Sequence, residues 1–211
     1  MIEVYAFATP NSIKVPIALE EAGLEYTLHS VNVRAGDQKL PGFLALNPNA
    51  KVPVLVDPHG PDGDTLLLTE SAAILVYIAE KSGQMLPAIG TERARVFEQL
   101  FFHASALSPS FGQAGYFQRF APEPMPHAIG RFLGEANRLV DLLEAKLERH
   151  RFVAGEEITI ADIAHYGWLW RREFIGIDFE NRPNLARWFE ALAARPSFQR
   201  AEHRLSALAP T

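Results

Sequence analysis

Short apolar runs typical of strands alternate with amphipathic stretches typical of helices in the first 84 residues of the chain. Strands are expected at residues 2–8, 26–33, 52–57 and 65–68. Helices are expected at residues 12–22, around 43–44, and at 71–82. The predicted order is therefore βαβ, a loop with a short helix, and then ββα.

Two of these helices have clear boundary signals. Asn11 or Ser12 is the expected N-cap of the helix that ends near Ala22, because short polar side chains accept hydrogen bonds from free N–H groups. Gly23 and Gly83 follow the last periodic residues, where glycine commonly ends a helix.

The hydrophobic period changes to 3.6 residues after a linker at residues 84–90 and keeps that value to the end. One helical stripe consists of Phe132, Ala136, Leu139, Leu143 and Leu147. Thr159 and Asp162 form an expected capping box at the start of another helix. The sequence thus predicts an α/β domain at residues 1–84 and an all-α domain at residues 91–211.

Composition narrows the classes of function. The chain has 211 residues, of which 48% are hydrophobic, and a net charge of -5 without a basic block, so nucleic acid is not an expected partner. No apolar run is long enough to span a membrane, and the strand pattern begins at once, so no signal peptide and a cytoplasmic location are expected. Because the chain has no cysteine, any thiol it uses must come from outside. No metal site is predicted.

Two motifs suit a small anionic peptide as ligand. Val52–Pro53 is a turn into a strand that can present backbone hydrogen bonds. Glu70 and Ser71 stand at a helix start, where free N–H groups favour a carboxylate, Ser71 adds a hydroxyl, and Glu70 can accept from an ammonium group. An ordinary trans proline and a plain N-cap are the alternatives.

An α/β unit of this order followed by an all-α domain resembles the cytosolic glutathione transferases along essentially the whole chain. The motifs that carry the resemblance are Val52–Pro53, Glu70–Ser71, Asn47-Pro48-Asn49 and the Thr159–Asp162 capping box. Thr9-Pro10-Asn11 after the first strand and Gly112-Gln113 in the second half are similar to the Nu-class, the bacterial glutathione-dependent disulfide-bond oxidoreductases.

The resemblance implies a thioredoxin-like domain that binds glutathione, joined to a helical domain. It implies a cis bond at Val52–Pro53 that lets Val52 pair with the cysteinyl backbone, and a γ-glutamyl site at Glu70–Ser71. Gln38 and Lys51 are expected at the glycyl end. Arg131 is expected to reach a second glutathione, with an exposed helix arginine as the alternative. Such proteins are commonly homodimers.

The resemblance places the ligand sulfur near Thr9 and Asn11, which can donate an O–H and an N–H to a thiolate. A free thiol has a pKa of about 8.5, and lowering it by two units needs roughly 2.7 kcal/mol, within reach of two or three charge-assisted hydrogen bonds. A simple turn is the alternative. The expected activity is glutathione-dependent reduction of small or mixed disulfides. Conjugation of glutathione to electrophiles and a non-catalytic binding or scaffold role are the alternatives.

Overall fold

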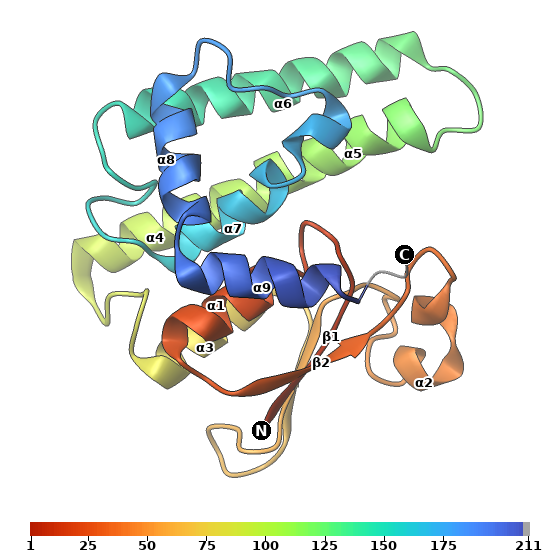
Figure 1. The fold of residues 1–211 in the computed structure, drawn as a ribbon, viewed down its shortest axis with the longest axis vertical. Helices are drawn as coiled ribbons and strands as arrows, with labels where there is room; N and C mark the ends of the chain where they lie inside the picture. The colour runs from red at the N-terminus through yellow and green to blue at the C-terminus, as the bar shows by residue number, and fades with distance from the viewer. Residues whose placement is uncertain (209–211) are drawn as a thin grey trace. The chain divides into compact units, whose positions relative to one another are not determined.

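The computed structural model describes residues 1–208 and divides into two compact units (Figure 1). The first unit contains residues 1–86 together with the chain from residue 193 onward, and the second contains residues 87–192. This division differs from the predicted boundaries at its C-terminal end, because the last helix packs against the α/β unit rather than against the helical one.

A four-stranded mixed sheet forms the centre of the first unit, in the order β2-β1-β3-β4. The strands are β1 (Ile2–Ala6), β2 (Tyr26–Ser30), β3 (Val54–Asp57) and β4 (Leu66–Leu68). β1 runs parallel to β2 and antiparallel to β3, and β3 is antiparallel to β4. Val4 pairs with both Leu28 and Leu55, and Val4 and Leu55 are fully buried. The predicted thioredoxin-like order is confirmed, with strands shorter than expected.

The helices of this unit are α1 (Lys14–Ala22), α2 (Pro41–Leu44), α3 (Ser71–Ser82) and α9 (Pro196–Ser206), with a short 3-10 helix, η1, at Asp37–Lys39. α3 has the predicted bounds, and Gly83 closes it with φ 69°. The predicted cap of α1 is wrong. Its N-cap is Ile13, without a side-chain bond, because the Ser12 hydroxyl accepts from the Thr9 hydroxyl in the preceding turn.

Helices build the second unit, as predicted. They are α4 (Gly90–Phe102), α5 (Ser108–Arg119), α6 (Pro126–Leu147), α7 (Ile160–Leu169) and α8 (Pro183–Ala193), with a π-helical segment at His103–Leu107 and a 3-10 helix at Arg172–Ile175. The α6 stripe is buried from Ala136 to Leu147, whereas Phe132 is half-buried and stacks on Phe117. Among the residues that the structure describes, no helix combines the length and apolarity that a membrane crossing requires.

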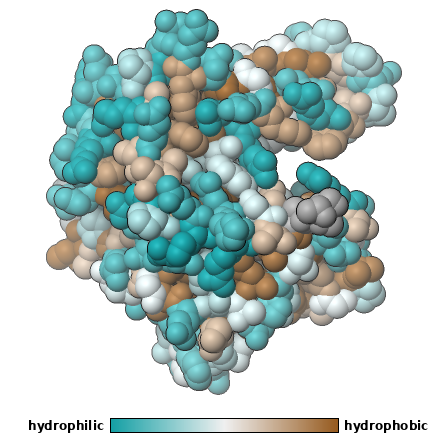
Figure 2. All heavy atoms as spheres, in the orientation of Figure 1, coloured by the Kyte–Doolittle hydropathy of each residue, from teal (hydrophilic) through white to brown (hydrophobic). Residues whose placement is uncertain are grey.

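Ion pairs attach α9 to α1 within the first unit. Arg195 donates to both carboxylate oxygens of Glu21 at 2.8 and 2.7 Å, and the Ser197 hydroxyl donates to the same carboxylate. Burial opposes the ionisation of Glu21, but these bonds outweigh it and hold the pKa of the carboxyl below its usual range. Figure 2 shows hydrophilic side chains over α9, where two further arginines pair with Glu20.

We expect Arg195→Ala to lower the free energy of unfolding by about 2 kcal/mol, because it leaves a largely buried carboxylate without its bidentate partner. Chemical denaturation at neutral pH measures the change. Arg138→Ala is the matched control, since Arg138 pairs with Glu135 by a similar fork on an exposed helix face and should change stability little. Equal effects of the two substitutions would contradict this account of α9.

Candidate functional site

A cavity of about 260 Å³ in the first unit gathers most of the predicted site. Its lining consists of Asn11, Asn47, Asn49, Lys51, Val52, Pro53, Glu70 and Ser71. Six of the nine predicted site residues are therefore in it, from the turn after β1, the loop before β3 and the start of α3. Segments far apart in the sequence meet here because β1 and β3 are neighbours in the sheet.

The loop before β3 is held in shape by Asn47, which is 4% exposed. Its amide donates to the Lys51 carbonyl at 2.7 Å, and its side-chain oxygen accepts from the Asn49 N–H at 3.0 Å. The Val52–Pro53 peptide bond is cis, as the resemblance implied. The Val52 side chain packs against a small hydrophobic cluster, which anchors the segment that lines the cavity.

The start of α3 has an unusual backbone. Glu70 is its N-cap residue with φ 66° and ψ 107°, a left-handed conformation that L-residues adopt at a cost on the order of 1–3 kcal/mol. The N-cap is Glu70 and its side chain makes no capping hydrogen bond, so the alternative of a plain N-cap is wrong. The first N–H groups of α3 therefore lie beside the cavity that Glu70 and Ser71 line, where they favour an anion.

Thr9 and Asn11 take different places in the turn after β1. The Thr9 hydroxyl donates to Ser12 Oγ at 2.9 Å and accepts from the Ser12 N–H at 3.2 Å, and Thr9 is not part of the cavity lining. Asn11 lines the cavity, and its Oδ1 accepts from Lys14 Nζ at 2.7 Å. The carboxamide of Asn11 thus has its oxygen engaged with Lys14, which leaves its N–H groups for another acceptor.

Lys14 is a site residue that the sequence interpretation missed. It is 1% exposed, and its Nζ donates to Asn11 Oδ1 and also to Ser71 Oγ at 3.3 Å. Burial lowers the pKa of Lys14 to about 7, while the negative charge of Glu70 acts in the opposite direction. A usable signal exists in the sequence: Lys14 is flanked on both sides by the apolar run of residues 13–19, and a lysine enclosed in this way is buried only with partners.

The remaining predicted residues have separate positions. Lys51 lines the cavity and is exposed. Gln38 lies in η1, donates from Nε2 to the Val33 carbonyl at 3.4 Å, and is not part of this lining. Arg131 is an exposed residue of α6, which belongs to the second unit. A glycyl contact by Gln38, a second glutathione at Arg131 and a homodimer stay predictions.

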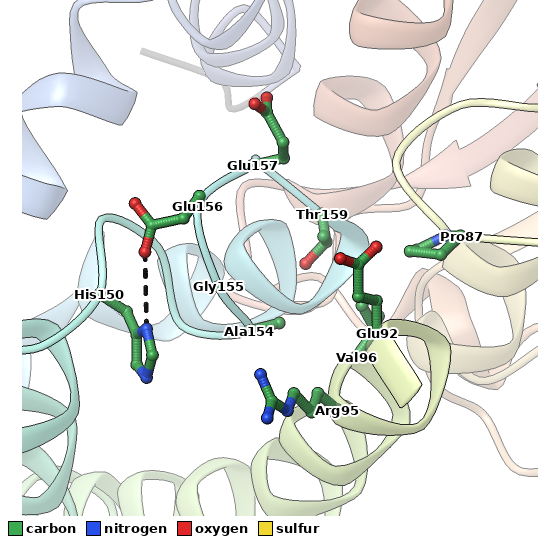
Figure 3. Close-up of a pocket in the computed structure, with 10 residues that line it drawn as sticks. All are labelled: Pro87, Glu92, Arg95, Val96, His150, Ala154, Gly155, Glu156, Glu157 and Thr159. Carbon is green, nitrogen blue, oxygen red and sulfur yellow. Dashed lines mark ion pairs between the residues drawn. The ribbon is translucent and has the colours of Figure 1, made fainter. Parts of the chain in front are cut away.

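Another pocket, of about 250 Å³, lies in the second unit near the start of α4 (Figure 3). Figure 3 shows the pair of His150 and Glu156, 3.6 Å apart, on one side and Arg95 on the other. The paired side chains are 41% and 72% exposed, so solvent weakens the contact between them. No predicted site residue lines this pocket, and across residues 1–208 no cluster of three metal-binding side chains forms. The cavity of the first unit is therefore the better candidate site.

Comparisons with known proteins identify relatives along most of the chain. Residues 8–81 match the glutathione S-transferase N-terminal domain and residues 130–196 its C-terminal domain. Disulfide-bond oxidoreductase YfcG of Escherichia coli (strain K12) is 40% identical over 201 residues, covering 93% of this chain and 92% of that protein. Disulfide-bond oxidoreductase YghU of the same organism is 36% identical over 213 residues, covering 94% and 73%.

Solved structures give the same assignment. A glutathione transferase family member from Pseudomonas fluorescens pf-5, with two glutathione bound, has a TM-score of 0.89 at 38% identity and covers 95% of this chain and 92% of its own. A glutathione transferase from Pseudomonas putida, with one glutathione disulfide bound per subunit, has a TM-score of 0.88 at 36% identity and covers 95% and 90%. The chain belongs to the glutathione S-transferase family.

Proposed function

We propose that the cavity of the first unit binds glutathione. The observation that carries the proposal is the meeting of six predicted residues from three separate segments in one cavity. Asn11 donates to the sulfur, the Val52 backbone pairs with the cysteinyl residue, and Lys51 attracts the glycyl carboxylate. Glu70 accepts from the γ-glutamyl ammonium group, and the start of α3 with Ser71 binds the γ-glutamyl carboxylate.

The reaction we propose is glutathione-dependent reduction of a small or mixed disulfide. Two relatives named as disulfide-bond oxidoreductases, and structures with two glutathione or with glutathione disulfide bound, support it. The chain has no cysteine, so thiol–disulfide exchange passes directly between bound thiols and disulfides.

Exchange takes two steps. The bound glutathione thiolate attacks one sulfur of the disulfide, a mixed disulfide with glutathione forms, and the other sulfur leaves as a thiolate that takes a proton from water. A second glutathione, also as thiolate, attacks the glutathionyl sulfur of the mixed disulfide and releases the second sulfur as a thiolate, which also takes a proton from water. The products are glutathione disulfide and two thiols, so two glutathione molecules supply the two electrons.

The test compares two second substrates at the same glutathione concentration. Turnover of bis(2-hydroxyethyl) disulfide, followed through glutathione reductase and NADPH, is expected to exceed turnover of an aryl halide, each after subtraction of the reaction without protein. Turnover of the aryl halide alone would favour conjugation. Binding of glutathione without either reaction would favour a scaffold role.

We expect Glu70→Gln to raise KM for glutathione about tenfold with little change in kcat, because the charge pair with the ligand ammonium exists equally in the ground and transition states. Steady-state kinetics with varied glutathione measure both constants. Glu25→Gln is the control for loss of one negative charge, since Glu25 is exposed and outside this cavity. A fall in kcat alone for the Glu70 variant would argue against a binding role.

A further inference from the structure

One buried ammonium group connects the two ends of the proposed glutathione site. Lys14 Nζ lies 2.7 Å from Asn11 Oδ1, at the end assigned to the sulfur, and 3.3 Å from Ser71 Oγ, at the end assigned to the γ-glutamyl group. The two partners are 60 residues apart in sequence and come from different elements. The chain thus places a charged side chain, 1% exposed, behind two groups that line the cavity.

We propose that Lys14 is a positioning residue: its ammonium group fixes the Asn11 carboxamide with the N–H groups toward the ligand sulfur, and it couples ligand binding to uptake of a proton. This inference rests on the proposed function. In the proposed complex Lys14 does not contact the reacting sulfur atoms, because Asn11 and Ser71 lie between its ammonium group and the cavity.

The locking of Asn11 follows from donor and acceptor chemistry. A charged lysine has three N–H donors and no acceptor, so it can bond only the oxygen of the Asn11 carboxamide. A neutral amine has a lone pair and can accept from the amide nitrogen, which permits the reversed orientation. In the reversed orientation the carboxamide oxygen faces the ligand sulfur and repels a thiolate. Protonated Lys14 therefore selects the orientation that stabilises the anion.

The charged groups around Lys14 make its protonation responsive to the ligand. Burial lowers the pKa of Lys14 to about 7, and Glu70 at the start of α3 opposes this change. Lys51 is the other charged group of the cavity. Glu21 and Glu20, in the last turn of α1, are bound by Arg195, which precedes α9, and by two arginines of α9. In the proposed complex the ligand's carboxylate binds at Ser71, which Lys14 Nζ itself contacts at 3.3 Å, while the ligand's ammonium group pairs with Glu70. The carboxylate is therefore the ligand charge nearer to Lys14, and it favours the charged form of the lysine.

Proton uptake on binding is the decisive measurement. S-methylglutathione is the probe, because its blocked sulfur releases no proton. Titration calorimetry at pH 7 in buffers of different ionisation enthalpy should show uptake of up to about half a proton per site, since Lys14 in the free protein is then about half charged. Affinity should fall as pH rises from 7 to 8.5, by up to about tenfold per unit.

Lys14→Met is expected to abolish both the uptake and the pH dependence while the fold is retained, because methionine is apolar and of similar length. Lys14→Gln serves as a second neutral variant. Ligand-free stability gives an independent check. Between pH 7 and the ordinary lysine value of 10.5 the unfolded chain binds one proton more than the folded protein, so the free energy of unfolding should rise with pH in the wild type relative to Lys14→Met.

A double-mutant cycle tests whether Lys14 acts through Asn11. Lys14→Met should lower kcat/KM for disulfide reduction at least tenfold in the wild type, and much less in an Asn11→Ala background. Absence of proton uptake in the wild type, unchanged uptake in both Lys14 variants, or additive effects in the cycle would overturn the inference. If the wild type neither binds glutathione nor reduces disulfides, the proposed function falls as well. If the wild type reduces disulfides and the Lys14 variants match it in kcat/KM and in proton uptake, this inference falls while the proposed function stands.

Discussion

Asn11→Ala is expected to lower kcat/KM for disulfide reduction about 100-fold, close to the loss seen when a single donor to a developing anion is removed. Asn11 lines the cavity, and its N–H groups are left for the ligand because Lys14 engages its oxygen. Loss of those donors raises the pKa of bound glutathione and reduces the thiolate fraction at neutral pH.

The ultraviolet absorbance of the bound thiolate, titrated against pH, measures the pKa of bound glutathione directly, and steady-state kinetics measure the loss in kcat/KM. Asn11→Asp should be worse than Asn11→Ala, because it removes the same donors and adds a negative charge beside the sulfur. Thr9→Val is the comparison within the same turn and should cost less, since the Thr9 hydroxyl donates to Ser12. A larger loss for Thr9→Val than for Asn11→Ala would show that Thr9, not Asn11, stabilises the thiolate.

Local signals in the sequence predict the parts of this fold whose causes are local. α3 begins at Ser71 and ends at Ser82 as expected, because periodicity and Gly83 determine its bounds. The capping box at Thr159 and Asp162 is confirmed for the same reason, since both partners lie within one helical turn. The strands are shorter than predicted because their ends depend on pairing with neighbours that are distant in the sequence.

The features that the sequence did not predict depend on contacts between distant segments. The apolar neighbours of Lys14 indicate that it is buried, but its bond to Ser71, 57 residues away, follows only from the packing of α1 against α3. The left-handed backbone of Glu70 has no local sequence signal, because such a conformation at a residue other than glycine is maintained by its surroundings. The position of Thr9 after the first strand predicts a contact with the ligand sulfur. The structure instead shows its hydroxyl bonded to Ser12, which depends on the conformation of the turn between them.

A residue of the second unit should have the largest effect on stability. Asp162 is fully buried and accepts four hydrogen bonds. The donors are Val153 N at 2.9 Å, Trp188 Nε1 at 2.9 Å, Thr159 N at 2.9 Å and Thr159 Oγ1 at 3.1 Å. Burial raises the pKa of this carboxyl, and the four donors act against the rise. One carboxylate thus connects the start of α7, the loop before it and α8.

Asp162→Ala is expected to lower the free energy of unfolding by about 4 kcal/mol or more, because it leaves a small cavity and several buried donors without an acceptor, each costing about 1–3 kcal/mol. Asp162→Asn should lower the free energy of unfolding by less than Asp162→Ala. The asparagine oxygen still accepts two of the hydrogen bonds, whereas its NH2 group faces the other two donors and cannot accept from them. Thr159→Ala, which removes only the cap hydroxyl, should cost about 1 kcal/mol. Denaturant unfolding followed by tryptophan fluorescence measures these changes, and Trp188 is one of the three tryptophans that contribute to the signal. If Asp162→Ala lowered the free energy of unfolding no more than Thr159→Ala, the hydrogen bonds from Val153 and Trp188 would contribute little to stability. The capping box would then stabilise only the start of α7.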